Sequence, residues 1–190
     1  MLAELKFILP EIIILSFVSL ILLLELFGFS KSTKNNMAYL LAQTALTAAA
    51  VSGLYITGGT GKLLLLKGSY VIDNFSVIVK ILFYIVTSVI LIYSRKYLIL
   101  RNSCTCEYLV LILLSLLGMM VLISSGSLLI LYLGLELFAL PLYALIAYVK
   151  ENKLGVEASM KYFIMGGLAS GLFLYGVSLV YGVTGNVDFV

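Results

Sequence analysis

The chain has 190 residues, of which 63% are hydrophobic and 11% charged, and its formal net charge is +3. A soluble domain is about half apolar and about a quarter charged, so this composition excludes a water-soluble globule and indicates an integral membrane protein. The chain has no histidine, which excludes imidazole metal sites and histidine proton relays, and its scattered basic residues form no nucleic-acid-binding face. The only cysteines, Cys104 and Cys106, cannot complete a metal site by themselves and are interpreted as reduced thiols without a function.

Six stretches reach the roughly 20 mostly apolar residues that a spanning helix needs. We therefore predict an all-α transmembrane bundle that forms a single domain over residues 1–190. The stretches are about Pro10–Phe27, Met37–Ile56, Asn74–Tyr93, Glu107–Ser124, Leu128–Val149 and Glu157–Tyr181. The first is too long for a signal-peptide core and has no small-residue cleavage site, so we expect a retained helix.

Two connections between these stretches have a recognisable form. The one after the second stretch, TGGTGKLLLLKGSYVID, contains a short apolar run that fits a small external hairpin. The fourth and fifth stretches are separated by little more than SSGS, which predicts a tight antiparallel pair of helices.

The basic residues are divided unequally between the two ends of the predicted helices. The N-terminus and the loops after the second, fourth and sixth stretches carry three, namely Lys6, Lys62 and Lys67. The other loops carry seven, namely Lys31, Lys34, Arg95, Lys96, Arg101, Lys150 and Lys153. Because basic loops stay in the cytoplasm, we predict that the N-terminus lies outside.

Most charged residues near the helix starts have ordinary structural explanations. Glu11 follows Pro10 directly, so the two fit a first helical turn, where the helix dipole favours an anion. Asp73 precedes the third stretch as a natural N-cap. Lys80 lies about two turns into that stretch, and we expect its side chain to reach back to the outer interface.

Glu136, in the run LYLGLELFALP, has no such explanation. It lies about 12 Å into the fifth stretch at the usual helical rise, too deep for its carboxylate to reach water. A charge at that depth costs a few kcal/mol unless it faces the bundle interior, holds a proton or meets a cation. Pro141 donates no N–H to the carbonyl of Leu137, and Gly134 leaves space nearby, so water entry is favoured. A proton relay is the predicted role, and a carboxyl hydrogen-bonded for helix packing is the alternative.

Lys161 is the second candidate relay residue, about one turn into the sixth stretch. Glu157 lies four residues earlier, in the favourable orientation for a helical ion pair, so an ordinary exposed pair is an equal alternative. By residue count Lys161 and Glu136 differ in depth by more than about 10 Å, so water or a further residue would have to connect them. Small residues spaced by four in the same stretch predict close helix contacts: Gly166 with Ser170, and Gly167 with Gly171.

Several of these motifs occur together in one known family. LYLGLEL, LPLY and EASMKY, within residues 107–167, closely resemble the subunit N family of bacterial NADH–quinone oxidoreductase, respiratory complex I. The LPE of the first stretch and the VIDNFS before the third are also similar to that family, so the resemblance covers essentially the whole chain. These proteins are antiporter-like membrane subunits.

The resemblance implies a multi-pass subunit of the bacterial inner membrane that contributes to proton translocation coupled to electron transfer from NADH to quinone. NADH, FMN, iron–sulfur clusters and quinone would be bound elsewhere in the complex, with no cofactor on this chain. The expected partners are the lipid bilayer and the other membrane subunits, especially neighbouring antiporter-like subunits. In that family, the glutamate at the position of Glu136 belongs to a proton half-channel, and a lysine at the position of Lys161 lies in the adjacent helix, so the resemblance implies these roles here.

The family is built from two inverted repeats, an arrangement also found in other transporters. This chain ends after its sixth predicted helix, inside the first repeat, so we expect a fragment, half of a split gene or a degenerate product. Two other functions remain open: a subunit of a multisubunit cation/proton antiporter, and a truncated structural membrane fragment without transport activity.

Overall fold

The computed structural model describes residues 6–26, 31–57, 63–100, 105–149 and 151–189. Within them, six helices are long and apolar enough to cross a membrane, which confirms the predicted all-α class. In chain order the elements are η1 (Lys6–Ile8), α2 (Leu9–Leu26), α3 (Lys31–Thr57), β1 (Leu63–Leu65), η2 (Leu66–Gly68), β2 (Tyr70–Ile72), α4 (Asn74–Leu100), α5 (Thr105–Ile123), α6 (Leu128–Ile146) and α7 (Lys153–Thr184).

Several helices extend beyond the apolar stretches that identify them. α3 begins at Lys31 instead of Met37, and α4 continues past Tyr93 to Leu100. α7 is longer at both ends, whereas α6 stops at Ile146. Hydropathy marks only the part of a helix that fits the lipid core, and polar flanks such as KSTKNN contain no proline or glycine to stop it. Phe27, the predicted end of the first stretch, lies outside the described residues.

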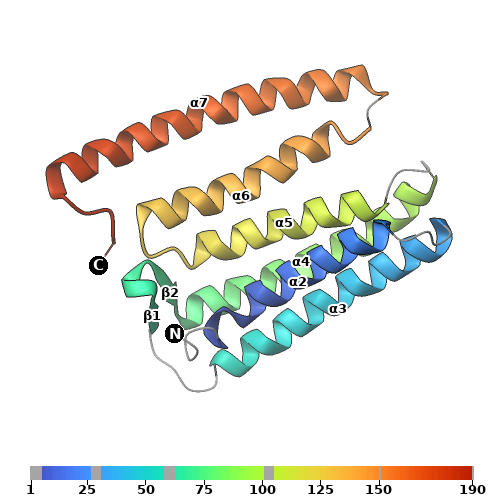
Figure 1. Cartoon of the computed structure of the whole chain (residues 1–190), viewed down its shortest axis with the longest axis horizontal. Coiled ribbons are helices and arrows are strands. Elements are labelled where there is room, and N and C mark those ends of the chain that lie inside the picture. Colours follow the sequence, from blue (N-terminus) through green and yellow to red (C-terminus); the bar gives the residue numbers. More distant parts are fainter. Residues whose placement is uncertain (1–5, 27–30, 58–62, 101–104, 150, 190) are drawn as a thin grey trace.

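The helices lie side by side, with the hairpin and both ends of the chain near one end of the bundle (Figure 1). α2 packs against α3 and α5, and α4 packs against α3 and α5. Ile14, Ile21, Leu109 and Leu113 are fully buried in this four-helix core. α6 lies along α5 and α7 lies along α6, so most of α7 is exposed within this chain.

The predicted hairpin is confirmed. β1 and β2 pair antiparallel with Leu63 opposite Ile72, and the chain turns between them at Gly68, whose φ of +96° favours glycine. The hairpin is bound to the α5–α6 turn, because Val71 N–H donates to the carbonyl of Ser124 at 2.8 Å and Gly126 N–H donates to that of Ser69 at 2.8 Å. These bonds fix the hairpin at the end of the helices.

The tight pairing of α5 with α6 is also as predicted, and glycine makes it possible. A Cβ on Gly134 would lie 2.7 Å from the amide nitrogen of Leu122, and one on Gly118 would overlap the backbone at Phe138. Two glycines, one on each helix, therefore let the backbones approach closely. The α5–α6 turn ends in Ser127, whose hydroxyl accepts from Ile130 N–H at 3.3 Å as the N-cap of α6.

The start of α4 carries the predicted N-cap. Ser76 N–H donates to Asp73 Oδ1 at 2.7 Å, and Asp73 N–H donates to Ser76 Oγ at 3.0 Å. These reciprocal bonds resemble a capping box and satisfy two backbone donors at the helix start. They set where α4 begins and, with it, the depth of every residue along it.

Candidate functional site

Glu136 lies near the middle of α6 and faces α7. The hydroxyl of Ser170 on α7 donates a hydrogen bond to Glu136 Oε1. One turn earlier on α6, the ring of Tyr132 stacks on that of Phe173, with centroids 6.1 Å apart. The carboxylate is therefore held between two helices by a neutral donor, at a half-buried position.

The α6–α7 contact continues past Glu136 around Tyr143. Ser159 Oγ on α7 donates to the Tyr143 carbonyl at 2.7 Å, and the Tyr143 ring meets Tyr162 edge-on with centroids 4.8 Å apart. Gly166 leaves the space that the Tyr143 hydroxyl occupies, because a Cβ there would overlap it. α6 remains a continuous helix through Pro141 up to this contact.

The two predicted pairs of small residues behave differently. Gly166 and Ser170 both face α6, as predicted. Gly167 and Gly171 have no atom within 4 Å of a built Cβ, so the helix contact that their spacing permits is not made within the described residues. They lie on the face of α7 turned away from α6, where the described residues provide no neighbouring helix.

Lys161 lies far from Glu136. Its ammonium binds Glu157 Oε1 at 2.6 Å, and both side chains are exposed, at 71% and 58%. The predicted i,i+4 ion pair is confirmed. Ser170, the α7 residue that reaches Glu136, comes nine positions later than Lys161, about 14 Å along the helix. The structure therefore does not bring the two candidate relay residues together.

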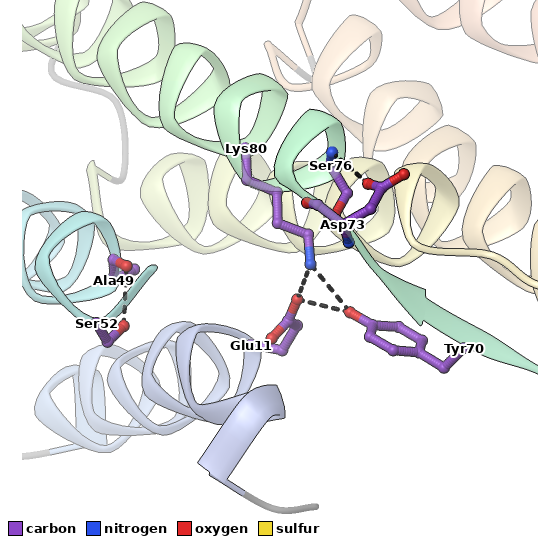
Figure 2. A network of polar contacts seen from close by, with 7 residues as sticks. All are labelled: Glu11, Ala49, Ser52, Tyr70, Asp73, Ser76 and Lys80. Carbon is purple, nitrogen blue, oxygen red and sulfur yellow. Dashed lines mark hydrogen bonds and ion pairs between the residues drawn. The ribbon is translucent and has the colours of Figure 1, made fainter. Parts of the chain in front are cut away.

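A second cluster of charges, which the sequence analysis did not find, lies among α2, α4 and β2 (Figure 2). Lys80 Nζ binds Glu11 Oε1 at 2.7 Å. The Tyr70 hydroxyl donates to the same oxygen at 2.7 Å, and Lys80 also donates to the Tyr70 oxygen at 3.2 Å. Lys80 is 4% exposed and Glu11 6% exposed, so this is a buried ion pair.

The expectation that Lys80 reaches the interface is therefore wrong. Its ammonium stays inside because Glu11, in the first turn of α2, lies beside it and compensates the charge. Burial raises the pKa of the Tyr70 phenol above its usual value, and the negative charge of Glu11 raises that pKa further. The phenol therefore stays protonated as a donor.

A sequence signal for this pair did exist. The first and third spans run in the same direction, and each carries one charge of opposite sign within two turns of its start. Comparing those depths identifies Glu11 and Lys80 as possible partners. When each residue is considered only within its own helix, Glu11 and Lys80 are not identified as partners.

Metal binding has little support in the described part of the chain. No group of three or more His, Cys, Asp or Glu side chains gathers there as a possible metal site. Cys106 is buried at the start of α5, and Cys104 lies outside the described residues.

Comparisons with known proteins give the class to which this fold corresponds. Residues 125–190 match a family model described as the membrane part of NADH:quinone oxidoreductase and the Mrp antiporter. A chain of respiratory complex I from Thermus thermophilus with bound aureothin superposes with a TM-score of 0.76 at 28% identity, over 94% of this chain and 38% of that one. A chain of the membrane-bound sulfane sulfur reductase, an archaeal respiratory complex, has the same fold, with a TM-score of 0.82 at 24% identity over 97% of this chain and 38% of that one. The chain thus has the fold of antiporter-like membrane subunits.

Relatives in sequence point to a narrower class of proteins than the fold does. NADH-quinone oxidoreductase subunit N of Methylovorus glucosotrophus is 45% identical over 95% of this chain, and that of Ruthia magnifica is 42% identical over 95%. Each match spans 37% of the relative. The chain is therefore related over nearly its whole length to subunit N of bacterial NADH–quinone oxidoreductase, and it spans little more than a third of those proteins. With its six spans, it is a multi-pass protein of the bacterial inner membrane.

Proposed function

We propose that this chain is the N-terminal part of a subunit N that contributes to proton translocation, coupled to electron transfer from NADH to quinone. The observation that carries the proposal is the 45% identity to such a subunit over 95% of the chain. The α6–α7 contact supports it, because the Glu136 carboxylate, on a helix apolar enough to span a membrane, accepts a hydrogen bond from a hydroxyl donor. The chain would act as one subunit of a translocase, within a complete complex.

Electron transfer would take place in other subunits. An iron–sulfur cluster is usually held by four cysteine thiolates, and this chain has two cysteines. NADH, FMN, the clusters and quinone would accordingly belong to the rest of the complex. The neighbouring antiporter-like subunits would be the direct partners of this chain in the membrane.

Glu136 is the proposed proton carrier. When Glu136 is ionised, its carboxylate accepts a hydrogen bond from the Ser170 hydroxyl. When Glu136 is protonated, its carboxyl can donate a hydrogen bond to the Ser170 oxygen, so Ser170 can bind both protonation states. Among the described residues no lysine or arginine forms an ion pair with Glu136, so changing its charge breaks no salt bridge.

Lys161 is proposed as a second relay group, nearer the N-terminal end of α7 than Ser170 is. Its ammonium is exposed within this chain, and its bond to Glu157 is the i,i+4 type that contributes little to stability. A path between Lys161 and Glu136 needs water or further residues, as does the remaining path across the membrane.

Replacing Glu136 with Gln in the assembled complex tests this function. The variant keeps the shape and hydrogen bonding of the side chain but carries no exchangeable charge, so we expect fewer protons translocated per NADH oxidised. Glu107→Gln, at the exposed start of α5, is the matched control and is expected to pump normally. Normal pumping by a normally assembled Glu136→Gln complex would show that the carboxylate has no relay role.

The family model also names the Mrp antiporter, which keeps cation/proton exchange as a second candidate. Measuring proton flux in vesicles distinguishes the two candidate functions. Proton flux through a cation/proton antiporter requires sodium, whereas proton flux through the proposed subunit requires NADH and quinone. Proton flux driven by a sodium gradient without NADH would favour the antiporter. A structural fragment would produce neither flux.

A further inference from the structure

A small cavity lies beside the buried ion pair, where α3 and α4 meet the start of α2 and the end of β2. Its volume is about 10 Å³, and its lining includes Gly53, Val77, Lys80 and Tyr84. An internal water molecule needs a cavity of about 10–15 Å³ on this measure, together with two to four polar partners. The cavity therefore has the size of one water molecule.

Two lining residues, Lys80 and Tyr84, carry polar groups, and Lys80 is bound to Glu11. The Lys80 ammonium has three N–H groups, and two acceptors are assigned to it, Glu11 Oε1 at 2.7 Å and the Tyr70 oxygen at 3.2 Å. The Tyr84 hydroxyl and Glu11 Oε2 are both buried and have no hydrogen-bond partner among the described residues. Buried oxygens of this kind are nearly always satisfied in folded proteins, and leaving them unpaired is costly.

We propose that this cavity is a specific site for one water molecule, which hydrates the Glu11–Lys80 ion pair. The water accepts a hydrogen bond from the third N–H of Lys80 and donates one to the Tyr84 oxygen. Through Lys80 the water is joined to the ion pair, because the same ammonium binds Glu11 Oε1 (Figure 2). A hydrated pair loses less solvation on burial than a dry one, which explains how an ion pair is accommodated between lipid-spanning helices.

Gly53 provides a variant that removes only the space for the water. A Cβ built there has Val77 Cγ1 as its nearest atom, at 3.8 Å, which is an ordinary contact. Gly53→Ala therefore fits the helix packing and places a methyl group in the cavity wall. Gly171→Ala on α7, where a built Cβ meets nothing within 4 Å, is the matched control for the change in helix propensity.

The test is a cryo-electron microscopy map of the protein in its native assembly, at a resolution that reveals ordered water. We expect a density peak between Lys80 Nζ and the Tyr84 oxygen in the wild type and in Gly171→Ala, and none in Gly53→Ala. The thermal midpoint of Gly53→Ala should lie below that of Gly171→Ala, because only the first loses the bonds of the water.

Well-ordered Lys80 and Tyr84 side chains without a peak in the wild type would overturn the proposal. An unchanged peak in Gly53→Ala, or a thermal midpoint at or above that of the control, would also overturn it. If Gly53→Ala does not assemble, Tyr84→Phe decides the question, since it removes only the hydroxyl. Loss of the peak in Tyr84→Phe supports the site, and an unchanged peak contradicts it.

Discussion

The strongest single perturbation that the structure predicts is Lys80→Met. The side chains of Lys80 and Glu11 are 6% and 8% exposed, so the substitution leaves a carboxylate buried without its cation. Removing one partner of a buried ion pair costs about 3–5 kcal/mol of folding free energy. The methionine fills a similar volume, so the loss is electrostatic and not a matter of packing.

Replacing both partners should recover most of that loss. In Glu11→Leu/Lys80→Met no charge remains, and such exchanges of a buried pair for apolar residues are often neutral. The Tyr70 hydroxyl then loses its acceptor, at a cost of about 1–3 kcal/mol for a buried unsatisfied group. The double variant should therefore be more stable than Lys80→Met alone, although less stable than the wild type.

Equilibrium unfolding by denaturant in mixed micelles measures these differences. Lys161→Met is the control, because its ion pair with Glu157 is exposed and worth under about 0.5 kcal/mol. A cost for Lys80→Met below about 1 kcal/mol would refute the reasoning. It would mean that the lysine reaches the interface, as the sequence alone predicts.

Three further outcomes follow from named contacts. Tyr70→Phe should lower the unfolding free energy by about 1.5–3 kcal/mol in the same assay, because a bond to a charged oxygen is lost. Folding raises the pKa of Tyr70, so the contribution of its hydroxyl to the unfolding free energy is complete below the unfolded pKa of about 10 and is lost as the pH rises towards the folded pKa. If the unfolding free energies of the wild type and Tyr70→Phe changed identically with pH above about pH 10, this reasoning would be contradicted. Gly166→Leu should collide with Tyr143 and cost about 1–3 kcal/mol of unfolding free energy, whereas Gly167→Leu, on the open face of α7, should change it by less than about 0.5 kcal/mol in the isolated chain.

The helices were predictable from sequence because hydropathy is a local property. Each span contains its own apolar residues, so a window along the chain identifies it without reference to any neighbour. The capping residue Asp73 and the i,i+4 pair of Glu157 with Lys161 are local in the same sense. The external hairpin was found because its connection is long and contains an apolar run.

The partners of the deep charges depend on packing between helices far apart in sequence. Glu11 and Lys80 are 69 positions apart, and the pair forms only because α2 and α4 bring both to the same depth. Ser170 is 34 positions from Glu136, and its hydroxyl was interpreted only as a small group for packing. Glu136 itself was identifiable, since its depth is fixed within one helix.

Glu11 and Glu136, which both belong to helices apolar enough to span a membrane, differ in what holds them. Glu11 is bound by a cation and a phenol at a buried position among α2, α4 and β2, so neutralising it would leave the Lys80 charge uncompensated. Glu136 is bound by the neutral hydroxyl of Ser170, between α6 and the largely exposed α7. A proton can therefore be added to Glu136 without leaving an unpaired charge among the described residues. On these grounds we propose that Glu11 and Lys80 hold the bundle and its hairpin together, and that Glu136 is the carboxylate that changes its charge.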